Sequence, residues 1–302
     1  MMELKIRIDN ADCYYTINDK ADQTFATFTR FDGNLPELSI PSEIEHGDIH
    51  IPVTEIGRKA LMGNRRLQQL ILPETVKKID DWAFAGCRRL REVVMPRVQL
   101  GKGVFQDCEG LRKIRVSDGE SEDVAALLSE AARHDIVYLL DPETVGSADW
   151  LRQWDAWLLR FLEQSDQEGY SGQVPCGEED YGTSDVGAYE SGRRREKAER
   201  CLLRLMYPEG LDAALEKRLS EYIASHTIRL EAGEEAWQML LQKHPEEKEW
   251  YEAFAKAGGL TEQNRDALLA SIPEEYAEMK AFFINFGQEK QKKAAFFSAL
   301  AL

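Results

Sequence analysis

The chain of 302 residues lacks the short motifs that mark most enzyme active sites. It has no nucleophile elbow G-x-S-x-G, no phosphate loop G-x-x-x-x-G-K-[ST] and no dinucleotide-binding G-x-G-x-x-G. Its five histidines are scattered, and no pair has the spacing of metal ligands on a predicted helix. Carboxylates number 54, so close pairs of them arise by chance. We therefore expect no catalytic residue, no metal site and no cofactor, and we predict that the protein is not an enzyme.

Long apolar runs are also missing. A secretory signal needs an apolar stretch near the N-terminus, but the first ten residues, MMELKIRIDN, have charges in its place. No uncharged apolar run approaches the ~20 residues that are needed to cross a bilayer. These absences predict a cytoplasmic protein that does not bind membranes.

Paired cysteines are absent as well. The five cysteines are an odd number, lie far apart and include no C-x-x-C pair: Cys13, Cys87, Cys108, Cys176 and Cys201. This usage favours reduced thiols in a cytosol over a disulfide framework or a zinc site. The acidic, Gly- and Ser-rich stretch at 165–190 lacks the D-x-D-x-D-G spacing of a calcium site, so we interpret it as a loop.

Positive charge is scarce overall but concentrated in one segment. The net charge of −16 disfavours nucleic acids and anionic membranes as partners of the whole molecule. Residues 56–116 nevertheless hold fourteen Lys and Arg against six Asp and Glu, a local charge of +8 that leaves −24 on the remainder. The basic segment could meet an acidic partner or the acidic C-terminal domain of its own chain, and both interpretations stay open.

The same segment is a threefold repeat. Its copies are IGRKALMGNRRLQQLILP from residue 56, IDDWAFAGCRRLREVVMP from 79 and LGKGVFQDCEGLRKIRVS from 100. Their starts are 23 and 21 residues apart, and the L-x-x-L-x-L spacing followed by a turn is typical of leucine-rich repeats. Each copy predicts one coil of a solenoid with a short parallel strand.

Side-chain alternation along each predicted strand separates a core face from an outward face. Leu70 and Leu72 point inward, whereas Gln69 and Ile71 point outward. Stacked strands lie ~4.8 Å apart, so equivalent outward positions form ladders. The predicted partner-binding residues are Gln69, Ile71, Arg66, Arg89, Glu92, Val94, Lys113 and Arg115. Two alternatives stay open, namely that the helical domain covers Ile71 and Val94, and that the arginines form a solvated edge that blocks strand addition.

One position of the repeat holds small polar residues, Asn64, Cys87 and Cys108. A small side chain fits inside the turn at this position. We expect Cys87 and Cys108 to be buried free thiols. A disulfide between them is the alternative, because adjacent coils approach bridging distance.

A short strand, a proline and then V-x-x-I-x-x-x-A-F-x-x-C-x-x-L resembles the BspA-type leucine-rich repeat family. The matching residues are Pro73, Val76, Ile79, Ala83, Phe84, Cys87 and Leu90. The upstream segments IPSEI and PVTEIG are similar to the same family, so the resemblance covers roughly residues 10–116. It implies a solenoid that acts as a binding surface, and several members are implied to be cell-surface adhesion proteins.

Both ends of the solenoid need a cap, because a terminal coil exposes its core. Alternation over Leu4–Ile8, Tyr14–Ile17 and Phe25–Thr29 predicts an N-terminal β cap. Beyond the repeats, Ser121 is expected to begin an amphipathic helix, and Ile136–Leu140 predicts one more strand.

From Asp149 onward the pattern is helical. Trp150, Trp154 and Trp157 recur at helical spacing and are interpreted as a core stripe. Further helices are predicted at Arg194–Met206, Leu211–Ser225, Glu234–Lys243, Glu247–Ala257, Glu262–Ser271, Glu274–Phe286 and Gln288–Ala301.

The sequence thus predicts an α+β protein, a short leucine-rich repeat solenoid with an N-terminal β cap followed by an all-α helix-hairpin array. The expected divisions are 1–55 (cap and first coil), 56–140 (solenoid and its C-terminal cap) and 141–302 (helical, with the 165–190 loop). The predicted function is non-catalytic protein–protein interaction with an unidentified protein partner. Adhesion at the cell surface and nucleic-acid binding through the basic face are the alternatives.

Overall fold

The computed structural model describes residues 2–8, 11–20, 23–117, 119, 121–170, 185–227 and 234–286. The chain divides into two compact units, Met1–Trp154 and Asp155–Leu302. The boundary lies within helix α2 (Ala148–Glu163). The first unit holds all the described strands, and the second is mainly helical where it is described.

The N-terminal strands form an antiparallel sheet in which apolar and polar residues alternate. β1 (Met2–Ile8), β2 (Ala11–Lys20) and β3 (Gln23–Asp32) pair in chain order. Tyr15 and Phe28 are fully buried, and their rings meet edge to face at 5.4 Å. The three strands predicted for the cap are confirmed, with longer bounds.

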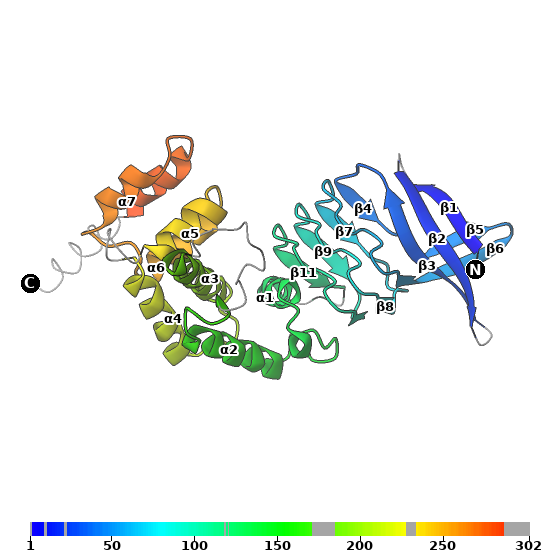
Figure 1. Ribbon diagram of the computed structural model, residues 1–302, viewed down its shortest axis with the longest axis horizontal. Coiled ribbons are helices and arrows are strands. Elements are labelled where there is room, and N and C mark those ends of the chain that lie inside the picture. Colours follow the sequence, from blue (N-terminus) through cyan, green and yellow to red (C-terminus); the bar gives the residue numbers. More distant parts are fainter. Residues whose placement is uncertain are drawn as a thin grey trace, which may run out of the picture. The chain divides into compact units, whose positions relative to one another are not determined.

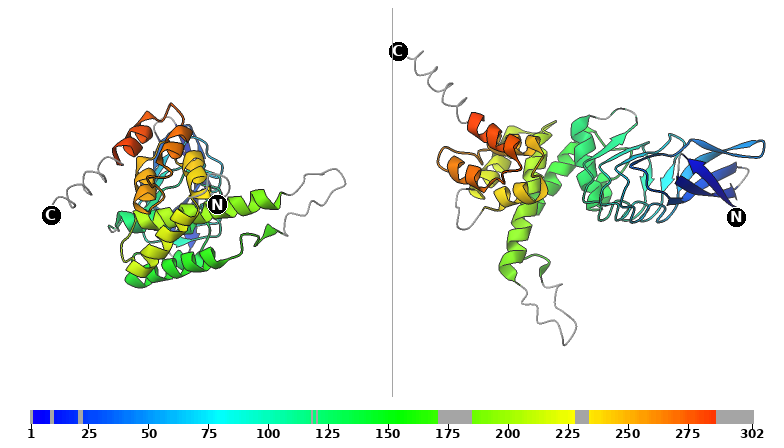
Figure 2. Two further views of the ribbon diagram at one scale, coloured as in Figure 1. Left: turned by 90° about the vertical axis from the view of Figure 1, so that its left-hand side faces the viewer. Right: turned by 90° about the horizontal axis from the view of Figure 1, so that it is seen from above.

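The solenoid builds two sheets, and each coil contributes to both. One sheet consists of the parallel strands β4 (Glu37–Ser39), β7 (Gln69–Ile71), β9 (Glu92–Met95) and β11 (Lys113–Val116). The other extends from β3 through β6 (Ile49–Ile56) and β8 (Lys78–Ile79) to β10 (Gln99–Leu100), with β5 (Glu43–His46) antiparallel to β6. Figure 1 shows β4, β7, β9 and β11 side by side, and Figure 2 shows the coils stacked in sequence order. The predicted fold class is confirmed.

Equivalent residues of successive coils stack in the core. Leu70, Val93 and Ile114 are register partners, and all three are fully buried. The rings of Phe84 and Phe105 lie 5.4 Å apart. Inward positions were predicted from the two-residue alternation, and the burial of these residues confirms the assignment. The alternation is a reliable guide here because the repeat keeps every coil in the same register.

The two repeat cysteines are buried free thiols, as expected. The Sγ of Cys87 donates to the carbonyl of Leu61 at 3.1 Å, and that of Cys108 donates to the carbonyl of Phe84 at 3.2 Å. Each thiol therefore ties its turn to the preceding coil, and the disulfide is not formed.

Helix α1 (Glu122–Arg133) caps the last coil. Its predicted N-cap is confirmed, since the Oγ of Ser121 accepts the backbone N–H of Val124 at 3.3 Å. The helix packs against β11, and the Oγ of Ser129 donates to the carbonyl of Arg112 at 2.9 Å. Figure 1 shows α1 beside β11 at the end of the stack.

The strand predicted at Ile136–Leu140 is wrong. Val137–Leu139 is a 3₁₀ helix, η1, in which Val137 and Tyr138 are exposed by 74% and 45% and Leu139 is buried. Helix α1 covers the last coil, so the apolar run finds no strand to pair with. The carbonyl of Leu139 instead accepts the indole N–H of Trp150 at 2.9 Å.

The tryptophan stripe predicted in α2 lies largely in the core. Trp150 and Trp154 are fully buried, whereas Trp157 is half-buried and stacks on Phe161 at 5.8 Å. The described helices that follow are α3 (Val186–Met206), α4 (Ala213–Ser225), α5 (Glu235–Lys243), α6 (Lys248–Lys256), α7 (Arg265–Ser271) and a segment at 277–286. Helix α3 contacts α4, α5 and α6, and Phe283 packs on Trp237 at 5.5 Å.

Helix α3 begins earlier than predicted. The stretch 165–190 was interpreted as a loop, but Asp185 caps α3 by accepting the N–H of Ala188 at 3.1 Å. Gly187 and Gly192 weaken the helical signal there, and the i,i+4 ion pair of Glu190 with Arg194 supports the helix. Residues 171–184 of the predicted loop, and the helix predicted at Gln288–Ala301, lie outside the described residues.

Candidate interaction surface

The outward residues of the β4–β7–β9–β11 sheet form two ladders, which together we call the outer face. One ladder is Glu37, Gln69, Glu92 and Lys113, and the other is Ser39, Ile71, Val94 and Arg115. All six predicted strand residues are brought together, and none is buried. Glu37 and Ser39 were missed, because outward positions were predicted only for the three repeat copies from residue 56 onward.

The positive charges at the β11 end of this face are compensated within the first unit. Lys113 Nζ lies 2.5 Å from a carboxylate oxygen of Glu122, and Arg115 pairs with both Glu122 and Glu92. Hydrogen bonds from Arg115 and then Lys113 lower the pKa of Glu122, and the bond to Glu122, followed by that to Glu92, raises the pKa of Arg115. The outer face is therefore close to neutral at this end.

Unpaired positive charge lies on the turns that lead into β7 and β9. Five exposed arginines gather there, and we call them the arginine edge: Arg65, Arg66, Arg88, Arg89 and Arg91. Arg88 lies 3.8 Å from Glu109, and the other four have no ion pair within the part of the chain that the structure describes. The arginines predicted as binding residues thus carry more free charge than the lysine and arginine of β11.

Local geometry fixes how the arginine edge is presented. The Oδ1 of Asn64 accepts the backbone N–H groups of Arg66 and Leu67, both at 2.9 Å, so the first turn is held rigidly. In the third coil the position equivalent to Arg66 and Arg89 is Gly110. A Cβ on Gly110 would lie 2.5 Å from the carbonyl oxygen of Arg88, which limits the edge to two coils.

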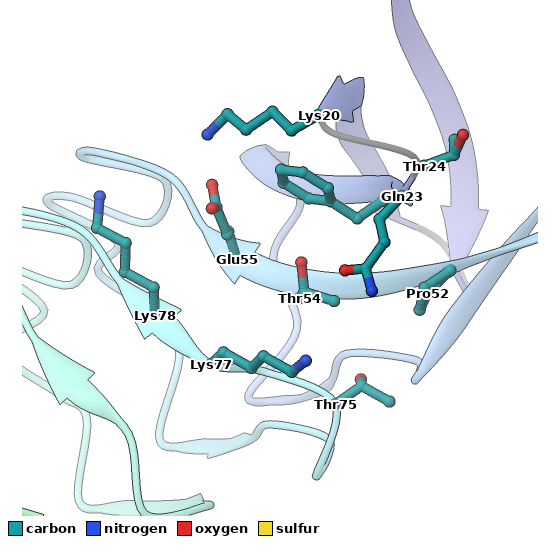
Figure 3. A pocket seen from close by; sticks show the side chains of 10 residues that line it. Lys20, Gln23, Thr24, Pro52, Thr54, Glu55, Thr75, Lys77 and Lys78 are labelled. Atoms are coloured by element: carbon teal, nitrogen blue, oxygen red, sulfur yellow. The ribbon is translucent and has the colours of Figure 1, made fainter.

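A second feature, which the sequence did not indicate, is an open pocket on the other sheet. It has a volume of about 620 Å³ and lies among β3, β6 and the segment that enters β8. Figure 3 shows three lysines around it: Lys20, Lys77 and Lys78. Its residues come from three separate stretches of the chain and form no motif, so no sequence signal could have found it.

Within the described ranges, no cluster of three or more His, Cys, Asp or Glu residues could hold a metal ion. None of the helices there combines the length and the apolar character that crossing a bilayer requires.

Two sheets of stacked parallel strands, to one of which the antiparallel N-terminal strands are added, recur at a 21–23-residue period and define a leucine-rich repeat solenoid. Residues 32–124 match the BspA type leucine rich repeat region in six copies, so this part of the chain consists of BspA-type leucine-rich repeats. That family is generally non-catalytic. Among curated protein sequences, none matches the chain.

Solved structures of bacterial leucine-rich repeat proteins resemble the repeat region. A leucine rich cell surface protein from Faecalibacterium prausnitzii is 25% identical, with a TM-score of 0.31, and the match covers 37% of this chain and 30% of that one. A leucine-rich repeat protein from Bacteroides capillosus is 24% identical over 36% of this chain and 78% of that one, with a TM-score of 0.29. The leucine-rich repeat protein of T. pallidum is 26% identical over 32% of this chain and 55% of that one, with a TM-score of 0.26. With such TM-scores, the likeness does not extend to ligands or partners.

Proposed function

We propose that the first unit is a non-catalytic binding module whose arginine edge and outer face dock an acidic segment of a protein partner. The observation that carries this proposal is that four exposed arginines of the edge, all but Arg88, have no carboxylate partner among the described residues. Arginine presents a planar fork of donors that matches a carboxylate, so clustered arginines favour carboxylate-rich partners.

The outer face would add contact area to this electrostatic attraction. Ile71 and Val94 are adjacent in register and half-buried, and Gln69 and Glu92 flank them with polar groups. A small apolar centre with a polar rim is the usual composition of a protein interface. The arginines would then speed association and set orientation, while the ladder residues supply the close contacts.

Charge reversal tests the proposal directly. A fluorescently labelled oligoglutamate peptide serves as the acidic probe, and its binding is followed by fluorescence polarisation at low ionic strength. We expect Arg66→Glu/Arg89→Glu to weaken binding by more than tenfold, and added salt to weaken binding to the unaltered chain, because exposed charges are screened.

The matched control is Lys217→Glu/Lys256→Glu, which changes the net charge equally but on exposed sites of the helical unit. This variant should bind nearly as well as the unaltered chain. Equal losses in both variants would mean that only net charge matters, and the chosen surface would be wrong. The single variant Lys113→Glu should have a smaller effect than Arg89→Glu, because Lys113 is already paired with Glu122.

Cell-surface adhesion is the second candidate. The Faecalibacterium prausnitzii relative is described as a cell surface protein. We propose a cytoplasmic location instead, on the ground that the repeat cysteines are unpaired thiols at adjacent coils. Cell fractionation decides between the two, since an adhesin would be recovered outside the cell.

A further inference from the structure

We propose that the pocket among β3, β6 and β8 binds an anionic sugar, a monosaccharide that carries a carboxylate or a phosphate. This site lies on the other sheet of the solenoid and is independent of the protein-binding function proposed above. Its volume of about 620 Å³ falls within the roughly 300–1,000 Å³ typical of small-molecule sites.

The charge of the pocket favours an anion. Among the described residues, three lysines line it against one carboxylate, that of Glu55. Glu55 also accepts a hydrogen bond from the hydroxyl of Thr27 at 3.2 Å. Lys78 lies 3.7 Å from Asp80, whereas Lys77 has no ion pair within the described ranges. Positive groups that line one hollow repel one another, and a bound anion relieves that repulsion.

The backbone that carries the exposed side chain of Lys77 is held in place by hydrogen bonds. The backbone N–H of Lys77 donates to the carbonyl of Thr54 at 2.8 Å. Two residues earlier, the hydroxyl of Thr75 donates to the carbonyls of Val53 at 2.7 Å and Ser42 at 3.2 Å. The segment that carries the lysine is therefore fixed to β6, so a ligand meets a partly preorganised site.

The neutral lining of the pocket suits a sugar better than a bare ion. The amide of Gln23 and the hydroxyl of Thr54 point to the pocket in Figure 3, and neither has a hydrogen-bond partner among the described residues. Such groups can bind sugar hydroxyls. The half-buried ring of Phe25 adds an apolar surface for the C–H face of a sugar ring. Lys20 Nζ lies 5.5 Å from the centre of the Phe25 ring.

Isothermal titration calorimetry on the full chain at low ionic strength tests the assignment with four probes: glucuronate, glucose 6-phosphate, glucose and inorganic phosphate. We expect at least one of the two acidic sugars to bind, and glucose and inorganic phosphate to bind at least tenfold more weakly. The acid that binds identifies whether the site takes a carboxylate or a phosphate. Binding of phosphate as tightly as glucose 6-phosphate would overturn the sugar assignment, and binding of neither acidic sugar would overturn the site.

Variants locate the binding on the molecule. Lys77→Gln/Lys78→Gln should weaken the acidic sugar by about tenfold or more, as expected when charged hydrogen bonds are lost. Arg65→Gln/Arg66→Gln removes the same charge from the arginine edge and should leave affinity unchanged. Thr54→Val, which keeps the side-chain shape, should weaken the sugar several-fold. Equal losses in the lysine and arginine variants would indicate diffuse attraction to a basic protein surface and would refute the pocket. Circular dichroism confirms that each variant is folded.

Discussion

At the scale of single residues, the interaction surface depends on which charges are paired. Arg89 and Lys113 carry the same sign and lie on neighbouring coils, yet of the two only Lys113 has a carboxylate of a described residue close by, at 2.5 Å. The sequence placed both in one basic block and could not separate them, because Glu122 belongs to a helix whose packing on β11 no repeat pattern encodes. The repeat pattern predicted where these residues lie on the solenoid. The structure was needed to show which of them is paired with a carboxylate.

Gly110 offers the clearest prediction at this scale. Replacing it with alanine places a Cβ 2.5 Å from the carbonyl oxygen of Arg88, a backbone atom that cannot rotate away. We expect Gly110→Ala to lower the free energy of unfolding by about 1–3 kcal/mol, as overpacking usually does. Urea denaturation measures the loss. The control is Gln106→Ala at an exposed position of the same coil, which should change stability by less than about 0.5 kcal/mol. A Gly110→Ala protein as stable as the control would show that the coil can shift.

At the scale of elements, periodic segments were predicted well and segments without a period were not. The strands β7, β9 and β11 follow from a repeat that fixes both spacing and facing. The run at Ile136–Leu140 is too short for its apolar residues to distinguish strand from turn, and it forms η1 because α1 covers the sheet end. The pocket combines Gln23, Thr54 and Lys77 from separate elements, so only the stacking of the coils reveals it.

Helix α1 makes a testable contribution to the outer face through Glu122. Its carboxylate compensates Lys113 and Arg115, so Glu122→Gln should expose positive charge and tighten binding of the oligoglutamate probe several-fold. Because the pKa of Glu122 is lowered, its ion pairs contribute stability above the carboxyl's ordinary pKa, and this contribution is lost as the pH falls through the lowered value. Glu122 is half exposed, so the stability change should stay below about 1 kcal/mol. The control is Asp123→Asn, beside it in the first turn. Unchanged peptide binding by Glu122→Gln would contradict the role of this carboxylate.

At the scale of the whole molecule, an acidic chain of net charge −16 holds a basic repeat segment. The expectation that the acidic helical domain contacts the basic repeats stays a prediction. It would make the helical domain a competitor for the same arginines that the proposed acidic partner needs. The unpaired arginines of the arginine edge imply a certain affinity for an oligoglutamate peptide. Binding of this peptide to the full chain that is far weaker than that affinity would support the competition.

The buried thiols give a prediction that spans both units. Cys13, Cys87, Cys108 and Cys201 are fully buried. Burial raises the pKa of Cys13 and Cys87 to about 11 and that of Cys108 to about 12, and it also raises the pKa of Cys201. In a Cys176→Ser variant, we therefore expect a thiol reagent to label no cysteine in the native chain and to label these four after unfolding in guanidinium.

The same pKa shifts predict the direction of alkaline destabilisation. Above pH 9 the thiols of the unfolded chain ionise, whereas the native thiols keep their protons up to about pH 11. Protons then bind more tightly to the native state, so stability falls as the pH rises, by about 1.4 kcal/mol per pH unit for each buried thiol. Urea denaturation between pH 8 and about pH 9.5, before most tyrosines of the unfolded chain ionise, measures the slope. Cys87→Ala lowers the free energy of unfolding at the starting pH. It should also make the fall in this free energy with pH less steep, by the contribution of one thiol. An unchanged slope in that variant, or rapid labelling of the native chain, would show that these thiols are accessible to solvent.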